Sequence, residues 1–469
     1  RAADAGLLTA EAAAAAEREP LPTRRRDFPL LAPQLTAREA AASPLEGEIR
    51  LTLERTLQER LEALAGERAR AIGPDVSVAI VVADHDGGAI EASVASAGLF
   101  ETRRRGFVDM TVAPRSPGST LKPFIYGLAF DAGIAHPQTL IEDRPVGFAG
   151  YAPQNFDKVF HGTVTIEQAL QMSLNVPAVE VLERVGPARL MARMRRAGVR
   201  PMLSDLSPPG LAIGLGGLGL SLTDLVTLYA ALARGGEPVG LHVRPEARGS
   251  DGTTKPVLGP LAAAYVTGIL AGRSGSVATE TRVAVKTGTS YGYRDAWAIG
   301  YDGRRVIGVW VGRPDGVPVS GLVGVDVAVP ILKDAFVRAG GAVPLPPAPA
   351  GLITASTGAL PPPLRRFGGD GRPGGAGASS GPAIAYPPDG AHIEIGLPGG
   401  GLAPLPLKVR SGEAPFTWFV DGAPIERDGF SRETSVAPAG AGFVTIAVVD
   451  GRGRSDRVRI FVDTPGRRR

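Results

Sequence analysis

The 469-residue chain contains no cysteine, which excludes disulfides, thiolate metal sites, iron–sulfur clusters and a cysteine nucleophile. It also has no run of about 18 apolar residues, the length that a membrane-spanning helix requires. The formal charge of +4 is small for this length and does not indicate a nucleic-acid partner. Because the five histidines show no metal-ligand spacing, we expect neither a metal nor a cofactor.

Two polar residue types are scarce. Six lysines stand against 45 arginines, and asparagine occurs only at Asn155 and Asn175. This bias is typical of a genome that favours arginine codons. Each remaining lysine or asparagine is therefore a position to inspect for chemistry that arginine cannot perform.

Glycine and proline divide the chain. Between Gly341 and Pro404 they make up 28 of 64 residues. Such a stretch cannot bury enough apolar surface to offset the entropy lost on ordering, so we predict a loose linker over residues 341–382. The linker separates a front domain, residues 49–340, from a C-terminal piece, residues 383–465.

Apolar periodicity predicts the elements of both parts. Strand patterns in the front domain lie at 76–84, 89–96, 282–286, 296–301 and 306–312. Helical patterns lie at 50–72, 119–132, 165–185, 187–197, 222–234, 260–271 and 325–339. This order predicts an α/β (α+β) domain with one sheet built from both ends of the segment. Short alternating strands in the C-terminal piece predict a small antiparallel β-sandwich.

One lysine has a serine three positions before it, in Ser119-Thr120-Leu121-Lys122. A turn-forming segment precedes Ser119, so we place Ser119 at the start of a helix, where positions i and i+3 share a face. A serine is a weak nucleophile until a base removes its proton. Lysine can act as that base when burial or a second cation disfavours its charged form, whereas arginine stays protonated.

Two further segments carry polar groups suited to binding a peptide. Ser173-Leu174-Asn175 falls at the end of a helical pattern, and a carboxamide offers both a donor and an acceptor to a peptide backbone. Lys286-Thr287-Gly288-Thr289 directly follows a strand predicted to end at residue 285. A glycine there allows an extended peptide to approach the sheet edge, and the lysine offers a cation to a carboxylate.

The three segments together are specific, since each pattern occurs once and in the order S-x-x-K, S-x-N, K-T-G. Two other matches are weak. The glycines from Gly214 to Gly219 fit a dinucleotide-binding pattern but lack a βαβ context, so we interpret them as a packing turn. The G-x-S-x-G match at residues 377–381 lies in the predicted linker and has no catalytic context.

From about Ile49 to Ala339 the chain resembles the transpeptidase domain of penicillin-binding proteins. The phrases RSPGSTLKPFIYGLAF, HGTVTIEQALQMSLNVPA and VKTGTSYGYRDAWAIGY are similar to the 1C group of the class A proteins of Gram-negative bacteria. The C-terminal piece resembles the small domain that follows the transpeptidase in that group. The resemblance implies a penicillin-binding protein/β-lactamase-like fold, with a β-sandwich after it.

The resemblance also implies roles for two groups of residues. The catalytic group, in which Ser119 is acylated and Lys122 acts as base, is Ser119, Lys122, Ser173 and Asn175. The group that binds the substrate and its carboxylate is Lys286, Thr287, Gly288 and Thr289. The backbone N–H groups of Ser119 and Thr289 form the oxyanion hole. The implied reaction is attack on a D-Ala-D-Ala bond and transfer of the acyl group to an amine, with β-lactams as mimics.

Members of this group begin with a cytoplasmic tail, a membrane helix and a glycosyltransferase domain. Residues 1–48 resemble only the last turns of that domain and a linker, so we expect glycosyltransferase activity only of a full-length parent. The resemblance implies a periplasmic location, with a membrane anchor in the missing segment. Cell-wall proteins are the implied partners of the C-terminal domain.

Three alternatives remain beside a D,D-transpeptidase. A class A β-lactamase needs a glutamate four residues before an asparagine. Tyr151 and Gln171 occupy those two positions here, which disfavours a β-lactamase. A D,D-carboxypeptidase, which uses water as the acyl acceptor, is harder to exclude from the sequence. A non-catalytic β-lactam sensor or cell-wall scaffold would lack turnover of a stem-peptide mimic.

Overall fold

A computed structural model describes the chain over residues 2–19, 30–146, 153–203, 210–247, 255–272, 283–368, 381–394, 404–425, 429–438 and 440–463. Among these residues, no helix has both the length and the apolar character needed to cross a membrane. Three helices lie outside the main packed layers: α1 Ala10–Arg18, α2 Pro33–Ala42 and α11 Pro362–Arg365.

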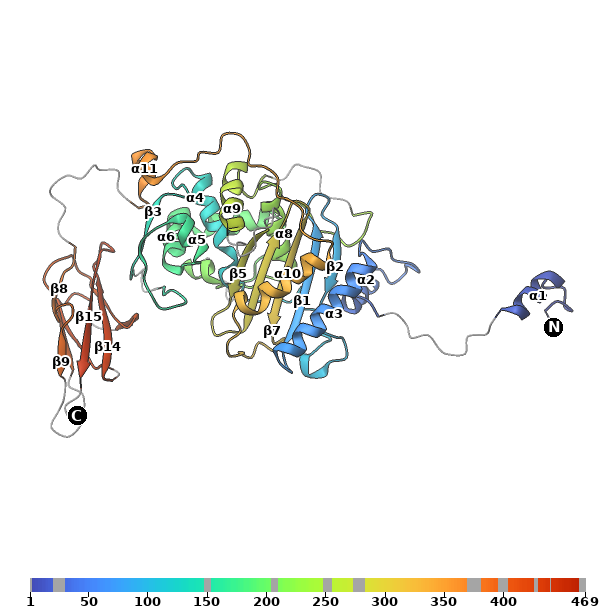
Figure 1. Cartoon of the computed structure of the whole chain (residues 1–469), viewed down its shortest axis with the longest axis horizontal. Helices are drawn as coiled ribbons and strands as arrows, with labels where there is room; N and C mark the ends of the chain where they lie inside the picture. Colours follow the sequence, from blue (N-terminus) through green and yellow to red (C-terminus); the bar gives the residue numbers. More distant parts are fainter. Residues whose placement is uncertain are drawn as a thin grey trace.

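The central sheet of the front domain joins two stretches that lie far apart in the sequence (Figure 1). Its five antiparallel strands follow the order β2-β1-β7-β6-β5. They are β1 Ser77–Asp84, β2 Ile90–Val94, β5 Ala284–Thr289, β6 Asp295–Tyr301 and β7 Arg305–Gly312. Strand β1 pairs with β7 over its full length, so the predicted single sheet built from both ends is confirmed.

Helices cover both faces of this sheet because successive strand residues point to opposite sides. Even-numbered residues of β1 belong to one apolar cluster with α3 and α10, and odd-numbered residues belong to another with α4, α8 and α9. These helices are α3 Arg55–Ile72, α4 Lys122–Asp131, α8 Leu222–Ala233, α9 Pro260–Gly272 and α10 Val329–Arg338. The second cluster is the larger and packs the start of α4, which carries the S-x-x-K lysine, against the sheet.

A smaller group of elements extends the helical side. It consists of β3 Leu140–Asp143, β4 Gly162–Thr165, α5 Ile166–Gln171, α6 Asn175–Val185 and α7 Pro187–Arg196. The predicted continuous helix over 165–185 is wrong, because the chain breaks between α5 and α6. Ser173 adopts a left-handed conformation with φ +58°, and Leu174 is extended, so the helical hydrogen-bond ladder cannot pass through them.

Part of the predicted loose linker packs on the front domain. Leu360 and Phe367 are buried, and the Phe367 N–H donates to the Leu140 carbonyl at 2.7 Å. Thr139 Oγ1 also donates to the Leu364 carbonyl at 2.6 Å. Composition gave the wrong result here because a few apolar residues anchor a segment that is otherwise rich in proline. Residues 369–380, which include most of the G-x-S-x-G match, lie outside the described residues.

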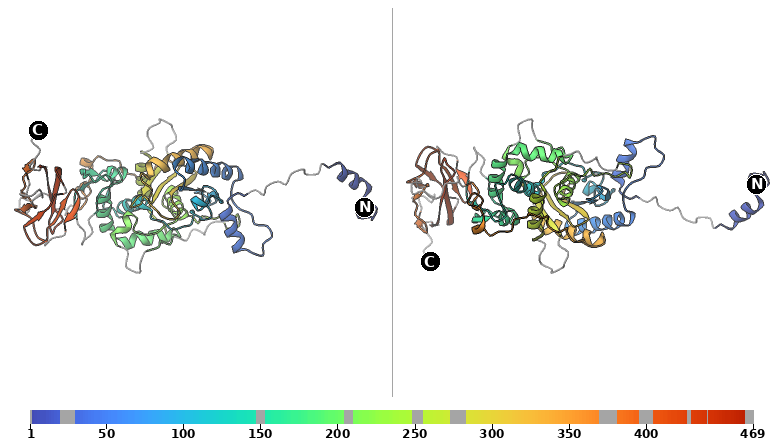
Figure 2. Two further views of the ribbon diagram at one scale, coloured as in Figure 1. Left: turned by 90° about the horizontal axis from the view of Figure 1, so that it is seen from below. Right: turned by 90° about the horizontal axis from the view of Figure 1, so that it is seen from above.

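The C-terminal piece is a β-sandwich, as predicted, although its strands are not all antiparallel, since β15 pairs with β9 in parallel. Its sheets have the orders β13-β10-β8 and β12-β11-β14-β15-β9, and side chains from both share one apolar core. The strands are β8 Ile384–Tyr386, β9 His392–Glu394, β10 Leu405–Val409, β11 Thr417–Val420, β12 Ala423–Ile425, β13 Glu433–Val436, β14 Gly442–Val449 and β15 Ser455–Asp463. The sandwich lies beside the α6 and β3 end of the front domain (Figure 1 and Figure 2). The Gln154 side-chain amide donates to the Gly422 carbonyl in the β11–β12 turn.

Candidate active site

The S-x-x-K segment lies where a tight turn enters a buried helix. A 3₁₀ turn over Gly118–Leu121 leads directly into α4, which begins at Lys122. Ser119 is partly exposed, whereas Lys122 is fully buried. Gly118 has φ +53°, and a Cβ there would lie 2.5 Å from the Thr289 carbonyl oxygen. Glycine at this position therefore allows the turn that carries Ser119 to touch the end of β5.

The Lys122 amine contacts the S-x-N segment directly. Its Nζ donates to the Ser173 carbonyl and, at 2.6 Å, to Asn175 Oδ1. The residues of α4 that follow it are apolar and buried as far as Phe130. The Lys122 amine therefore lies at the N-terminal end of a buried helix, against the S-x-N segment.

Ser173 joins the two motif lysines. Its left-handed backbone belongs to a class of conformations that costs about 1–3 kcal/mol for a non-glycine residue and persists only where the surroundings enforce it. This conformation turns the carbonyl toward Lys122 and the hydroxyl toward Lys286, whose Nζ donates to Ser173 Oγ at 2.8 Å. Lys286 is 2% exposed, so one serine bridges two buried lysine side chains.

The K-T-G-T segment lies within β5. The prediction that it follows the end of a strand is therefore wrong. It pairs with β6 throughout, from Lys286 opposite Ile299 to Thr289 opposite Ala296. Lys286 and Gly288 are buried, while Thr287 and Thr289 alternate with them and are partly exposed. Thr289 Oγ1 accepts the Gly324 N–H at 3.1 Å, which leaves its hydroxyl proton to be donated elsewhere.

Gly288 is the point of closest approach between β5 and the turn that carries Ser119. A Cβ at this position would lie 2.6 Å from the Pro117 carbonyl oxygen and 2.7 Å from Thr120 Cγ2. Neither contact can be relieved without moving backbone or a buried side chain. We expect Gly288→Ala to displace β5 from Ser119 and to slow acylation by a fluorescent penicillin by about 100-fold.

Gly268 in α9 supplies the matched control for this substitution, because a Cβ there meets no atom within 4 Å. Gly268→Ala should label at the wild-type rate. A Gly288→Ala variant that also labels at the wild-type rate would show that the close approach is not required.

The two asparagines of the chain meet at this site. Asn155 Oδ1 accepts the Asn175 N–H at 2.8 Å, and Asn175 Nδ2 donates to the Gln154 carbonyl at 2.6 Å. Asn155 Nδ2 in turn donates to both carboxylate oxygens of Asp143, at 2.9 and 2.8 Å. Sequence reasoning assigned no role to Asn155 or Asp143, although the scarcity of asparagine was a signal for the first.

A half-buried carboxyl group on α6 lies close to two other carboxyl groups. Burial raises the pKa of Glu180 from its ordinary value of 4.5 to about 7, and the neighbouring Glu142 and Glu183 raise it as well. Burial also raises the pKa of Asp143, against the opposing effect of the hydrogen bonds from the His161 N–H and the Asn155 amide. The folded chain therefore favours a protonated Glu180 near pH 6.

The raised pKa of Glu180 predicts a pH-dependent stability. The stabilisation of the protonated form is complete below about pH 4.5 and is lost as the pH rises through about 7. Glu180→Gln removes this titration, so from pH 5 to pH 8 the wild type should lose about 2 kcal/mol of unfolding free energy relative to the variant. Denaturant unfolding of both proteins at the two pH values measures the difference, and a constant difference would contradict the prediction.

The glycine-rich segment between Gly214 and Gly219 acts in packing, as interpreted from the sequence. Gly216 has φ +95°, and a Cβ there would lie 2.6 Å from Ser116 Oγ. The Ser116 hydroxyl donates to the Gly216 carbonyl at 2.8 Å, and Trp297 Nε1 donates to the Ser116 carbonyl at 2.9 Å. The segment thus supports the turn that leads into Ser119.

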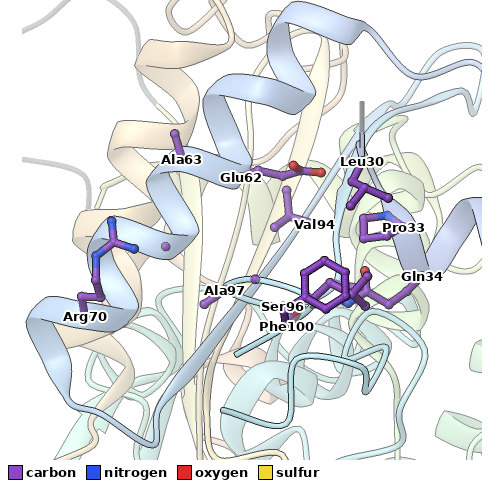
Figure 3. Close-up of a pocket in the computed structure, with 14 residues that line it drawn as sticks. Leu30, Pro33, Gln34, Glu62, Ala63, Arg70, Val94, Ser96, Ala97 and Phe100 are labelled. Carbon is purple, nitrogen blue, oxygen red and sulfur yellow. Dashed lines mark hydrogen bonds between the residues drawn. The ribbon is translucent and has the colours of Figure 1, made fainter. Parts of the chain in front are cut away.

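A cavity of about 300 Å³ lies elsewhere, between α2, α3, β2 and the loop after β2 (Figure 3). None of the motif residues lines it. Two of its polar side chains are engaged within the fold, since the Gln34 amide donates to Ser96 Oγ and Glu62 Oε1 accepts the Ala32 N–H. In the described parts of the chain, no three side chains are grouped so that they could hold a metal ion.

Comparison with known proteins places this site in a family. A family model described as the penicillin binding protein transpeptidase domain matches residues 78–313, which is half of the chain and extends from β1 to just beyond β7. A second, the penicillin-binding protein C-terminus family, matches residues 374–460. The chain belongs to the penicillin-binding protein transpeptidase family.

Individual relatives agree with this assignment. The chain is similar to penicillin-binding protein 1C of Escherichia coli (strain K12), with 40% identity over 338 residues, or 71% of this chain and 43% of that protein. It is also similar to penicillin-binding protein 1A of Neisseria gonorrhoeae, with 29% identity over 59% of this chain and 37% of that protein. The chain thus spans less than half the length of these curated relatives.

Solved structures give the same fold. Penicillin-binding protein PonA1 from Mycobacterium tuberculosis superposes with a TM-score of 0.58 at 22% identity, covering 70% of this chain and 99% of that one. Penicillin-binding protein 1A from Haemophilus influenzae gives a TM-score of 0.57 at 14% identity, covering 72% of this chain and 74% of that one. At these identities the likeness concerns the fold alone, and it confirms the fold class expected from the sequence.

Proposed function

We propose that this chain is a serine D,D-transpeptidase that cross-links peptidoglycan stem peptides through an acyl-enzyme on Ser119. The observation that carries the proposal is the position of Lys122. Its amine lies three residues after Ser119, is fully buried, and is held by the Ser173 carbonyl and Asn175 Oδ1. Burial disfavours a charged ammonium and so favours the neutral amine that can accept a proton.

In the proposed reaction, Ser119 Oγ attacks the carbonyl carbon of the penultimate D-Ala while Lys122 accepts the hydroxyl proton. The negative charge that develops on the carbonyl oxygen faces the backbone N–H groups of Ser119 and Thr289. The terminal D-Ala leaves as an amine, which takes up a proton, and an ester remains on Ser119. An amine of a second stem peptide then attacks the ester, forms the cross-link and restores the serine hydroxyl.

The substrate would lie along β5. This strand forms one edge of the sheet, where Thr287 and Thr289 are partly exposed. An extended peptide can pair with such an edge, and the cation of Lys286 can attract the terminal carboxylate. A β-lactam, whose ring carbonyl and carboxylate mimic the dipeptide, would occupy the same place. One related structure, PonA1, is described in complex with penicillin V.

The proposal is tested by incubating the chain with a fluorescent penicillin and mapping the adduct by mass spectrometry. We expect the adduct on the peptide that contains Ser119, and a second assay should transfer a donor acyl group from a D-Ala-D-Ala peptide to an amine. Release of D-Ala without a cross-linked product would instead indicate a D,D-carboxypeptidase. Labelling without turnover of the donor would indicate a β-lactam sensor.

For the rest of the chain, we propose that residues 1–48 are the end of a glycosyltransferase domain and a linker. Residues 49–340 would form the transpeptidase domain, joined by residues 341–382 to a β-sandwich over 383–465 that binds cell-wall proteins. The family assignment supports a periplasmic location, with membrane anchoring and glycan polymerisation as properties of a longer parent.

A further inference from the structure

We propose that Asn155, held by Asp143, is a positioning residue that fixes Asn175 against the Lys122 amine. This inference rests on the proposed function of the site. Four residues from separate parts of the chain follow one another through hydrogen bonds: Asp143 in β3, Asn155 in the loop before β4, Asn175 at the start of α6, and Lys122 at the start of α4. Asn155 bonds to the backbone N–H of Asn175, and the Asn175 side chain bonds to Lys122.

The Asn155 carboxamide is used on both sides. Its Oδ1 accepts the Asn175 N–H, while its Nδ2 donates to the Asp143 carboxylate and, at 2.8 Å, to the Val159 carbonyl. The side chain is 4% exposed and Asp143 is 0% exposed, so neither group can exchange these partners for bulk water. An acceptor is needed toward α6 and a donor toward the carboxylate, and a carboxamide supplies both.

The N-terminus of α6 depends on this contact. Leu174 precedes the helix and supplies no side-chain cap, so the Asn175 N–H would otherwise be one of the unpaired donors of a helix start. Asn155 supplies the acceptor from 20 residues earlier in the sequence. Together with the bond from Asn175 Nδ2 to the Gln154 carbonyl, it fixes both the backbone and the amide of Asn175.

The other end of this series of hydrogen bonds lies in the two-stranded sheet formed by β3 and β4. Asp143 is the last residue of β3 and lies opposite Gly162 of β4, and its carboxylate also accepts the His161 N–H at 2.7 Å. The position of Asn155 is thus set by an element that contains none of the three motifs. Because Asn155 holds Asn175, it also fixes Asn175 Oδ1 at 2.6 Å from Lys122 Nζ.

A pair of substitutions separates positioning from simple stability. Asn155→Asp keeps the shape and the acceptor but faces Asp143 with a second carboxylate and removes the donor. The double variant Asn155→Asp/Asp143→Asn exchanges the two groups, which restores one donor between them and keeps an acceptor for the Asn175 N–H. Asp157→Asn, in the same loop, is the matched control, since Asp157 bonds to Val159 and His161 and not to Asn175.

Acylation by penicillin is measured as a maximum rate and a half-saturating concentration. The rate is expressed per active site, and mass spectrometry gives the number of sites that can be acylated. We expect Asn155→Asp to lower the maximum rate by about 10- to 100-fold with little change in the half-saturating concentration, because the reacting groups are displaced. The double variant should recover to within about threefold of the wild type, and Asp157→Asn should match the wild type.

Two results would overturn the inference: an Asn155→Asp protein whose folded fraction acylates at the wild-type rate, or a folded double variant that stays as slow as the single one. If the single variant does not fold, the double variant alone decides between rescue and failure. A wild-type chain that penicillin does not acylate at Ser119 would instead refute the proposed function, and the inference with it.

Discussion

Ser119→Ala is expected to abolish covalent labelling by penicillin and transfer of the stem-peptide acyl group. The substitution removes the one oxygen that the proposed mechanism uses as nucleophile. Because Ser119 is partly exposed on its turn, the apolar core should be unchanged and the unfolding free energy should stay within about 1 kcal/mol of the wild type. Gel fluorescence and the intact mass of the treated protein measure the loss.

The exposed Ser356, in the segment that follows the front domain, provides a control, since Ser356→Ala makes the same chemical change away from the site. That variant should label as the wild type does. Persistent labelling of Ser119→Ala would place the nucleophile elsewhere and refute the assignment of the catalytic serine.

Lys122→Arg is expected to be nearly as damaging, although it keeps a positive charge. A guanidinium stays protonated and cannot accept the serine proton, and loss of a general base costs about 100- to 10,000-fold. The larger group must also fit a position where the lysine is fully buried. The second-order rate constant for acylation by a fluorescent penicillin gives the size of the effect.

The second buried lysine tests whether charge alone explains the result. Lys286 also contacts Ser173, but in the proposed mechanism it acts as a cation toward the carboxylate. Lys286→Arg should therefore lose less activity than Lys122→Arg. Equal losses, or near-normal acylation by Lys122→Arg, would remove Lys122 from the role of base.

Sequence patterns predicted much of this arrangement because several constraints are local. The spacing of Ser119 and Lys122 is that of a helical turn, and short apolar runs rich in β-branched residues mark the strands of the sheet. The break at Ser173 could not be predicted in the same way. Apolar periodicity continues through it, and the left-handed conformation is held by partners from α4 and β5.

The features that the sequence did not predict all depend on contacts between residues far apart in the chain. The meeting of Asn155 with Asn175 joins a loop to a helix start, and no local pattern specifies that pairing. Leu360 and Phe367 are isolated apolar residues in a segment rich in proline, so its average composition concealed that they are buried. The scarcity of asparagine indicated which residues to inspect, but only the fold shows what they bind.

The strand order β2-β1-β7-β6-β5 also sets a sequence of assembly. Within the residues that the structure describes, the edge strand β5 pairs only with β6, β6 is joined to β1 through β7, and β7 ends at Gly312. Lys286 therefore has no complete sheet to join until the chain has been synthesised as far as Gly312, although the turn with Ser119 is made much earlier. Since non-local pairing is slow, the site becomes competent as a late event of folding. Acylation by penicillin at the proposed site would thus also report that a newly made chain has completed its sheet.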